Sequence, residues 1–447
     1  MAGRTPHGLR LAQPVAGLNH VIAYGQSLAT GWEGWPALSL PPRGDSLMLG
    51  RSVRPVSENA PQFVPVGGPS LHPLAATVQD IPTGVLLSEA QVAELPPGSV
   101  ALGETVLEGA VHAYRTGLLA ARGAAASPAL VLASACGVGG RTLEALSRGA
   151  QPELFNRLRD CAALAKQAAV AGGQPYQVLA LLLLQGEHNA WALNGGTADR
   201  AGYRALLARL YHDAMAELAH GIAGQDAPPA LFTYQTGGAY ASDELGVAMA
   251  QLDAALGLPG CFMAGPVYPV TDKGGHLDAN GYRWLGAQFG KVMHRVLTLG
   301  EAWRPLHPIA ATLRGPVVLA RFAVPVPPLA WGRPFAGHLA VAVADRGFTL
   351  TDADGIVPVQ DVALAGADLV AVTLAHPPRG AATLRYADRR HGGLGALHDS
   401  DATVAEDCYV FDPRTGHAAS AAVPDLVGRP YPLMNWCVAF NIPVNLG

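Results

Sequence analysis

The chain has 447 residues, of which 50% are hydrophobic and 14% are charged, so a large core is available and disorder of the bulk of the chain is excluded. A formal net charge of −4 provides no basic field for nucleic acid or anionic lipid, and the longest apolar runs are far too short to span a bilayer. We therefore expect a small neutral substrate, and neither a nucleic acid nor a membrane as partner.

The chain start and the cysteines bear on compartment and cofactors. The opening residues, MAGRTPH, lack the apolar core of a signal peptide, which predicts a cytoplasmic protein, or an exported one supplied without its leader. The cysteines are odd in number and form no C-x-x-C pair, so we expect mostly buried thiols, no metal and no cofactor. They are Cys136, Cys161, Cys261, Cys408 and Cys437. Nothing in the sequence indicates an oligomeric state.

Short apolar runs that end in Gly-rich polar turns predict the main sheet. They are His20–Tyr24, Ala129–Ser134, Val178–Leu184 and Ala230–Tyr234, with helical patterns at Glu153–Ala171 and Arg200–Ala219. Apolar strands that alternate with helices indicate a parallel sheet covered on both faces. Ligands bind beyond the carboxyl ends of such strands, so the polar turns at 25–27, 137–142 and 185–189 are where we expect the chemistry.

Two regions depart from this alternation. Residues 36–110 form a decorated insertion rich in Pro and Gly, with no predictable elements. After a helix that ends near Gly300, the runs Val317–Val326, His338–Val343, Leu369–Leu374 and Ala381–Tyr386 are strand-like and separated by turns. We therefore predict two domains, 1–305 of α/β type and 306–447 as a small β-sandwich-like domain.

The first polar turn contains Gly25-Gln26-Ser27. A Ser between a strand and a helix exposes its hydroxyl at the sheet edge, and its N–H points outward with the positive end of the helix. The alternative is a plain N-cap. The lipase-type G-x-S-x-G elbow is not matched, because residue 29 is Ala.

The second turn, Cys136–Thr142, supplies N–H groups at Gly139 and Gly140. It differs from the dinucleotide fingerprint G-x-G-x-x-G because Thr142 stands where the third Gly is required. Gly at these positions allows a close backbone approach, either to a substrate oxygen or to a neighbouring loop.

The remaining turns add a polar cluster and an acid–imidazole pair. Gln185-Gly-Glu187-His188-Asn189 ends the most apolar strand, and is either part of a site or a capped turn. It is not a metal-binding H-E-x-x-H. Asp272 and His276 share a loop before the last helix, where a carboxylate could fix the imidazole tautomer or serve structure alone.

In this order the four turns resemble the sequence blocks of the SGNH (GDSL-like) hydrolase superfamily, and more narrowly its sialate O-acetylesterase and acetylxylan-esterase branch. The branch has blocks that read G-Q-S, G-G-x-S/T, Q-G-E-x-N/D and D-x-x-H. The match covers about residues 18–298, and the stretch from His276 to Gly286 is its most specific part. The resemblance implies a three-layer α/β/α, flavodoxin-like hydrolase domain.

The resemblance also implies roles. Ser27 is the expected nucleophile, His276 the general base and Asp272 its orienting acid, although three residues separate the last two where the family has two. The N–H groups of Ser27 and Gly140, with the side chain of Gln185 or Asn189, are the expected oxyanion hole. The expected substrate-binding residues are Gln26, Trp32, Gly139, Arg141, Glu187 and His188.

The leading hypothesis is a serine esterase that removes acyl groups, in particular acetyl, from a small or polymeric carbohydrate. Alternatives are a carboxylesterase for other esters, such as short acyl esters or polyesters, and a catalytically silent carbohydrate-binding module. In the C-terminal region, Trp331 and Trp436 could present a sugar-binding surface, or they could be buried in the β-domain.

Overall fold

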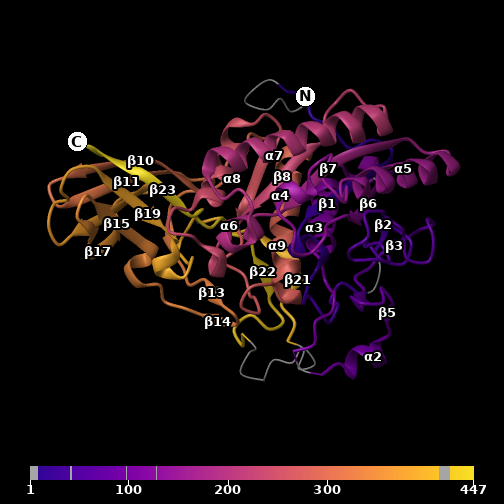
Figure 1. Cartoon of the computed structure of the whole chain (residues 1–447), viewed down its shortest axis with the longest axis horizontal. Coiled ribbons are helices and arrows are strands. Elements are labelled where there is room, and N and C mark those ends of the chain that lie inside the picture. The colour runs from indigo at the N-terminus through magenta and orange to yellow at the C-terminus, as the bar shows by residue number, and fades with distance from the viewer. Residues whose placement is uncertain (1–8, 41–42, 97, 127, 412–422) are drawn as a thin grey trace.

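The computed structural model of the protein describes residues 9–40, 43–96, 98–126, 128–411 and 423–447. Figure 1 shows an α/β part, in which helices surround a central sheet, and beside it a β-rich part built from the C-terminal third of the chain. No helix in the described residues is long and apolar enough to cross a membrane.

The central sheet has seven strands in the order β3-β2-β6-β1-β7-β8-β9, and only β3 pairs in the antiparallel direction. Its strands are β1 (Gly17–Gly25), β2 (Arg43–Leu49), β3 (Leu71–Leu74), β6 (Ala129–Ala135), β7 (Tyr176–Leu184), β8 (Ala230–Gln235) and β9 (Cys261–Pro266). The four predicted strand runs are confirmed, and β9 adds a strand that was not predicted. Strands β1 and β6 to β9 follow the doubly wound order 2-1-3-4-5.

Helices cover both faces of this sheet because the strands are apolar on both sides. Along β1, Val21 and Ala23 join the core under α3 (Val106–Arg122) and α9 (Ala279–Met293). Alternate residues of β1 join a second core under α5 (Asn156–Ala171), α7 (Arg200–Ala214) and α8 (Gly246–Gly257). The predicted helices at 153–171 and 200–219 are confirmed, the second continuing as a π-helix, Met215–Ala223.

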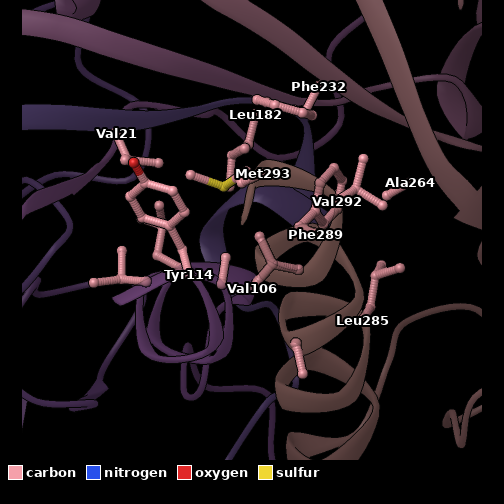
Figure 2. Close-up of a cluster of buried hydrophobic side chains, with 14 of the residues drawn as sticks. Val21, Val106, Tyr114, Leu182, Phe232, Ala264, Leu285, Phe289, Val292 and Met293 are labelled. Carbon is pink, nitrogen blue, oxygen red and sulfur yellow. The ribbon is translucent and has the colours of Figure 1, made fainter. Parts of the chain in front are cut away.

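Helices α3 and α9 pack directly against each other, and their side chains meet against the strands of the sheet (Figure 2). A Cβ on Gly286 would lie 2.3 Å from the carbonyl oxygen of Val106, and one on Gly290 would lie 2.4 Å from that of Ala110. Glycines therefore let the two backbones approach. This contact fixes the position of α9, whose N-cap, Asp278, follows His276 and Leu277 in the chain.

Residues 36–110 are only partly peripheral. They supply β2 and β3 to the edge of the central sheet and the first turns of α3. The remainder forms short elements, β4 (Val78–Gln79), β5 (Leu86–Leu87) and α2 (Glu89–Ala93). These elements pack around the buried indole of Trp35, which lies just after the segment that carries Ser27. The insertion thus supports one wall of the region around Ser27.

The C-terminal part is built on one eight-stranded sheet in the order β16-β15-β19-β23-β10-β11-β18-β17. The strands are β10 (His307–Arg314), β11 (Val317–Ala323), β15 (Phe348–Asp352), β16 (Gly355–Val357), β17 (Val359–Leu364), β18 (Leu369–Leu374), β19 (Ala382–Tyr386) and β23 (Phe440–Leu446). All neighbours are antiparallel except β10 and β23. Strands β15 and β17 contact each other across the core, so one sheet curls over itself where a stack of two sheets was expected.

Short ladders complete the C-terminal part. They are β12 (Ala330–Trp331) with β20 (Leu397–His398), β13 (Phe335–Ala336) with β14 (Leu339–Ala340), and β21 (Val404–Cys408) with β22 (Pro430–Pro432). The predicted runs at 317–326, 369–374 and 381–386 are confirmed as strands. The run 338–343 is a strand only at β14, and 3-10 turns follow it.

The two parts of the chain share a core. Met249 and Tyr268 of the α/β part lie in the same apolar cluster as Phe348 and Phe440 of the β-rich part. Lys291 of α9 is buried against the carboxylate of Asp401, and this burial lowers the pKa of Lys291 to about 8. The β-rich part is therefore held rigidly against the α/β part.

Candidate active site

Ser27 lies at the carboxyl edge of the central sheet. Strand β1 ends at Gly25, whose φ is 142° and where a Cβ would lie 2.0 Å from the carbonyl oxygen of Leu184, so only Gly fits. Gln26 is extended, and α1 (Ser27–Thr30) begins at the next residue and ends at Gly31. Ser27 is the first helical residue, and such an N–H has no partner within its helix. Its side chain is largely buried, with a residue exposure of 7%.

His276 lies 249 residues after Ser27 in the chain, just before the last α-helix of the α/β part. It lies in a hairpin between β9 and α9, where the N–H of Lys273 donates to the carbonyl oxygen of His276 at 2.7 Å. The Nε2 atom of His276 lies 2.9 Å from the Oγ of Ser27, within hydrogen-bond reach of the hydroxyl proton. The indole of Trp32 lies beside the imidazole, with ring centroids 6.0 Å apart.

The second ring nitrogen of His276 faces Glu33. The Nδ1 atom lies 3.2 Å from Glu33 Oε2, and both side chains are about one-quarter exposed. Glu33 has a φ of 62°, a left-handed conformation that costs energy for any residue with a Cβ. Two hydrogen bonds fix this turn, from the Glu33 N–H to the Ala101 carbonyl oxygen and from Lys273 Nζ to the Glu33 carbonyl oxygen.

Asp272 does not take the place that the sequence predicted for it. Its carboxylate accepts a hydrogen bond from the N–H of Gly274 at 2.6 Å, so the side chain closes its own turn. Its backbone N–H donates to the carbonyl oxygen of Gly337, and it forms an antiparallel bridge with Leu277. Within the described part of the chain the imidazole of His276 pairs with Glu33 instead. The short spacing to His276 places Asp272 in the hairpin, not on the ring.

The sequence therefore missed Glu33. The only signal for it was local, an acidic residue six positions after Ser27 and between Trp32 and Gly34. A search restricted to acids near His276 could not find it.

The amides of Gln185 and Asn189, expected in the oxyanion hole, are fully buried and their hydrogens are used within the protein. Gln185 Nε2 donates to Asn189 Oδ1 at 2.6 Å and also lies within reach of Arg141 O and Gln26 Oε1. Asn189 Nδ2 donates to Glu144 Oε2 and Thr197 O, both at 3.0 Å. In this arrangement neither amide has a hydrogen left for a substrate oxygen, and the expectation is wrong for both.

Gln26 is held differently. Its Oε1 atom accepts from the N–H groups of Gly186 and His188 and from the amide of Gln185. Its Nε2 atom has no hydrogen-bond partner among the residues that the structure describes. Gln26 thus anchors the turn after β7 to the segment of Ser27 and keeps two N–H hydrogens available next to that residue.

The Gly loop after β6 lies against the same segment. The N–H of Val138 donates to the carbonyl oxygen of Gly25, and that of Gly139 donates to the carboxylate of Glu58 at 2.9 Å. Burial raises the pKa of Glu58, and this N–H opposes the rise. Gly140 follows with a φ of 63°, and no described group lies within 4 Å of the place where its Cβ would be. The N–H of Gly139 is thus occupied, whereas we find no described partner for that of Gly140.

The other predicted substrate-binding residues take mixed positions. Glu187 is buried and accepts hydrogen bonds from Tyr234 and Thr236, and this burial raises its pKa. Glu187 is therefore part of the frame of the site. His188 is partly exposed, and burial with the nearby Arg141 cation lowers its pKa. Trp32 lies between the imidazole and the Gly loop, where its ring would meet a Cβ on Gly139 at 3.2 Å.

The cysteines and charged groups provide no second centre. Four of the five thiols are buried, as expected, and Cys408 is partly exposed. The described residues contain no group of three or more His, Cys, Asp or Glu side chains that could hold a metal ion. At Ser27 the structure places a hydroxyl beside one imidazole nitrogen, a carboxylate beside the other and N–H groups nearby, an arrangement that can support nucleophilic chemistry.

Comparison with known proteins gives structural likeness only. No protein-family model and no curated protein matches the chain. A carbohydrate acetylesterase from Xanthomonas citri is similar with a TM-score of 0.54 and 15% identity, over 95% of this chain and 80% of that chain.

Two further structures match less closely. NanS matches with a TM-score of 0.41 and 14% identity, over 63% of this chain and 98% of that chain. Est24, a carbohydrate acetylesterase from Sinorhizobium meliloti, matches with a TM-score of 0.30 and 12% identity, over 63% of this chain and 99% of that chain. The likeness to the Xanthomonas citri enzyme shows that the present chain shares its fold over most of its length.

Proposed function

We propose that the protein is a serine esterase that removes acetyl groups from a carbohydrate, with Ser27, His276 and Glu33 as nucleophile, base and orienting acid. The observation that carries the proposal is the continuous chain of contacts from Glu33 Oε2 to His276 Nδ1 at 3.2 Å and from His276 Nε2 to Ser27 Oγ at 2.9 Å. Two segments far apart in the sequence, residues 27–33 and the hairpin of His276, converge to make it, which packing alone does not require.

The first half of the reaction forms an acyl-enzyme. The Oγ of Ser27 attacks the ester carbonyl carbon while His276 Nε2 takes the hydroxyl proton. Glu33 accepts a hydrogen bond from the Nδ1–H of His276, which holds the tautomer that leaves Nε2 unprotonated and stabilises the imidazolium that forms. Collapse of the tetrahedral intermediate breaks the bond to the sugar oxygen, which leaves with the proton from Nε2.

The second half regenerates the enzyme. A water molecule gives a proton to His276 and its oxygen attacks the acyl carbon. The bond to Ser27 Oγ then breaks, Oγ recovers the proton from Nε2, and acetic acid is released. No cofactor is needed, because every proton that leaves one group returns to another.

Three donors support the developing oxyanion in this proposal: the N–H of Ser27, the N–H of Gly140 and the free Nε2 of Gln26. The first lies at the start of α1, and the other two have no described partner. Removal of one such donor typically costs roughly 10²- to 10³-fold in turnover. Gln26 takes the part that the sequence had offered to Gln185 or Asn189, and those residues fix Gln26 and the Gly loop.

The carbohydrate substrate and the family are further parts of the proposal. The fold likeness to a carbohydrate acetylesterase supports both. We propose that residues 1–305 form a flavodoxin-like SGNH hydrolase domain of the sialate O-acetylesterase and acetylxylan-esterase type. Residues 306–447 form its accessory domain.

The test is the fate of Ser27. The variant Ser27→Ala should lose about 10⁴- to 10⁶-fold in kcat on 4-nitrophenyl acetate, and Ser70→Ala, which changes an exposed serine far along the chain, should lose nothing. A serine-directed organophosphate should modify Ser27 alone, as read by mass spectrometry. Absence of hydrolysis in the parent protein, or equal rates in Ser27→Ala, would reject a Ser27 enzyme and favour a binding module.

The substrate class needs a separate comparison. The parent should release acetate from acetylated xylan or acetylated sialic acid faster than it cleaves 4-nitrophenyl octanoate. A clear preference for the long acyl chain would reject the carbohydrate part of the proposal and favour a general carboxylesterase.

A further inference from the structure

We propose that a groove at the border of the α/β and β-rich parts binds an uncharged oligosaccharide chain that leads into the active site. The inference rests on the proposed function and deepens it, because it specifies that the acetyl ester is carried on an oligosaccharide chain. Its centre is the exposed ring of Trp191 with the half-buried ring of Tyr240, together with residues of the C-terminal part that also line the groove.

The groove has a volume of about 1120 Å³, at or above the upper end of the ~300–1,000 Å³ range of small-ligand pockets. One wall consists of the segments after β7 and β8, which include Trp191, Leu193 and Tyr240. The other wall includes Arg389 and Asn441 of the β-rich part. In Figure 1, α6 (Glu187–Ala190) and α8 lie at this border, next to the C-terminal strands. A single sugar ring would leave most of this space empty.

Of the two aromatic side chains, that of Trp191 is unusually exposed and that of Tyr240 is half-buried. Trp191 is 53% exposed, although a large indole in a stable monomer is ordinarily mostly buried. Its ring centroid lies 6.0 Å from that of Tyr240, with the planes inclined by 59°. Two adjacent rings in different planes offer apolar faces to successive sugar units of a twisted chain. The indole Nε1–H of Trp191 and the hydroxyl of Tyr240 have no hydrogen-bond partner in the described chain.

The polar lining indicates an uncharged ligand. Arg200 is held by Asp253 at 2.5 Å, and Asp199 caps α7 through the N–H of Gly202, so neither charge is available to a ligand. Glu244 also lines the groove and pairs with Arg385 at 3.3 Å, so Arg389 and Asp243 remain, one of each sign, with the amide of Asn441. This lining offers hydrogen bonds to hydroxyl groups without an excess of positive charge that would select uronic acids or sialic acid.

Tyr240 connects the groove to the neighbourhood of Ser27 and His276. This residue also lines a neighbouring cavity of about 230 Å³ whose wall includes Leu28, Glu187 and Gly275. A Cβ on Gly275 would lie 3.3 Å from the Tyr240 hydroxyl, and the next residue in the chain is His276. Trp191 is tied to the same region, since its N–H donates to the carbonyl oxygen of Glu187 at 3.1 Å.

The C-terminal part fixes the groove. The N–H of Gly238 lies 3.4 Å from the carbonyl oxygen of Gly393, and a Cβ on Gly393 would lie 2.2 Å from Gly238 O. The loop that carries Tyr240 is therefore seated on the β-rich part. The tryptophans expected to carry a sugar-binding surface there are otherwise engaged, because Trp436 packs on Tyr268 and His398 and the Arg346 cation covers Trp331.

Kinetics on two acetyl esters of different size test the groove. In Trp191→Ala, the ratio of kcat/KM for acetylated xylohexaose to that for 4-nitrophenyl acetate should fall about tenfold. Trp191→Phe should recover most of it, because a flat apolar face remains. Ile309→Ala is the matched control, since Ile309 is likewise exposed, at 60%, but lies on β10 outside the groove. This variant should leave the ratio unchanged.

Direct binding separates this inference from the proposed function. Calorimetry on Ser27→Ala with xylohexaose, mannohexaose and chitohexaose should show binding of at least one, weakened in the double variant with Trp191→Ala. If the parent hydrolyses acetyl esters while none of these hexasaccharides binds, or an oligogalacturonate binds better than all three, the groove proposal is overturned and the esterase stands. If a hexasaccharide binds through Trp191 but no ester is cleaved, the groove proposal stands and the esterase proposal is overturned.

Discussion

Two turns meet at the imidazole of His276: the turn after α1, which carries Glu33, and the hairpin before α9, which carries Asp272. Asp272 is four residues from His276 in the chain, and Glu33 is 243 residues away. Yet it is the distant carboxylate that lies against Nδ1. The comparison teaches that nearness in sequence selects the hairpin partner, whereas tertiary packing selects the partner of the ring.

The local chemistry of the two turns explains the difference. Asp272 is followed by Gly274, and a short Asp side chain closes such a turn on its own backbone. Glu33 has a left-handed conformation, and its turn is fixed by the backbone, through the hydrogen bond from its N–H to Ala101 O. Its longer side chain is directed out of the turn, to the imidazole.

The largest expected effect is on turnover in two amide variants. Glu33→Gln should lower kcat by about 10³- to 10⁴-fold, because an amide can donate to Nδ1 and so favour the tautomer whose Nε2 carries the proton. Asp272→Asn should lower it less than about threefold, because an Asn oxygen still accepts from the N–H of Gly274. Steady-state rates on 4-nitrophenyl acetate measure both.

The unfolding temperatures of the two variants serve as the control for this contrast, since both should remain folded. The kcat of Glu33→Asp should lie between those of the parent and Glu33→Gln, because the charge is kept but the shorter side chain does not reach Nδ1. If kcat falls as much in Asp272→Asn as in Glu33→Gln, the orienting role belongs to Asp272.

A second, smaller effect concerns the contact between the two turns. Lys273 of the hairpin donates from Nζ to the carbonyl oxygen of Glu33 at 2.7 Å and lies over the ring of Trp35. Lys273→Met keeps the apolar stem but removes this hydrogen bond, worth about 1 kcal/mol, so kcat should fall about fivefold as Glu33 loses its fixed position.

Lys166→Met is the matched control, because Lys166 Nζ makes a similar bond to the carbonyl oxygen of Ile222 at 2.6 Å, away from Ser27. It should leave kcat unchanged. Equal rates in the parent and in Lys273→Met would mean that the turn of Glu33 is held by its own bond to Ala101 alone.

Much of the fold could be predicted because its signals are local. Apolar runs that end in Gly turns located β1, β6, β7 and β8, and the order of the four sequence blocks singled out Ser27 and His276, which the structure brings to 2.9 Å. What failed depends on contacts between distant segments. Glu33 is positioned by Ala101 and Lys273, and the amides of Gln185 and Asn189 are occupied by Arg141, Glu144 and Thr197, none of which the local pattern reveals.

The smallest effect is one on stability, and it distinguishes the two carboxylates without measuring activity. Burial raises the pKa of Asp272 above its usual value, and the repulsion from Asp278 adds to this, while the N–H of Gly274 opposes it. A carboxyl whose pKa is higher in the folded than in the unfolded state is destabilising when ionised, and this penalty disappears as the pH falls through the folded-state pKa.

Asp272→Asn should therefore be more stable than the parent at pH 7, by no more than about 0.5 kcal/mol. The difference should shrink toward zero as the pH is lowered toward the ordinary pKa of an aspartate, about 4. Urea unfolding of both proteins at several pH values measures it. A catalytic Asp272 held ionised by the imidazolium would give the opposite sign, with a variant less stable than the parent at neutral pH. The sign of this small difference thus tells whether the nearer acid serves the hairpin or the ring.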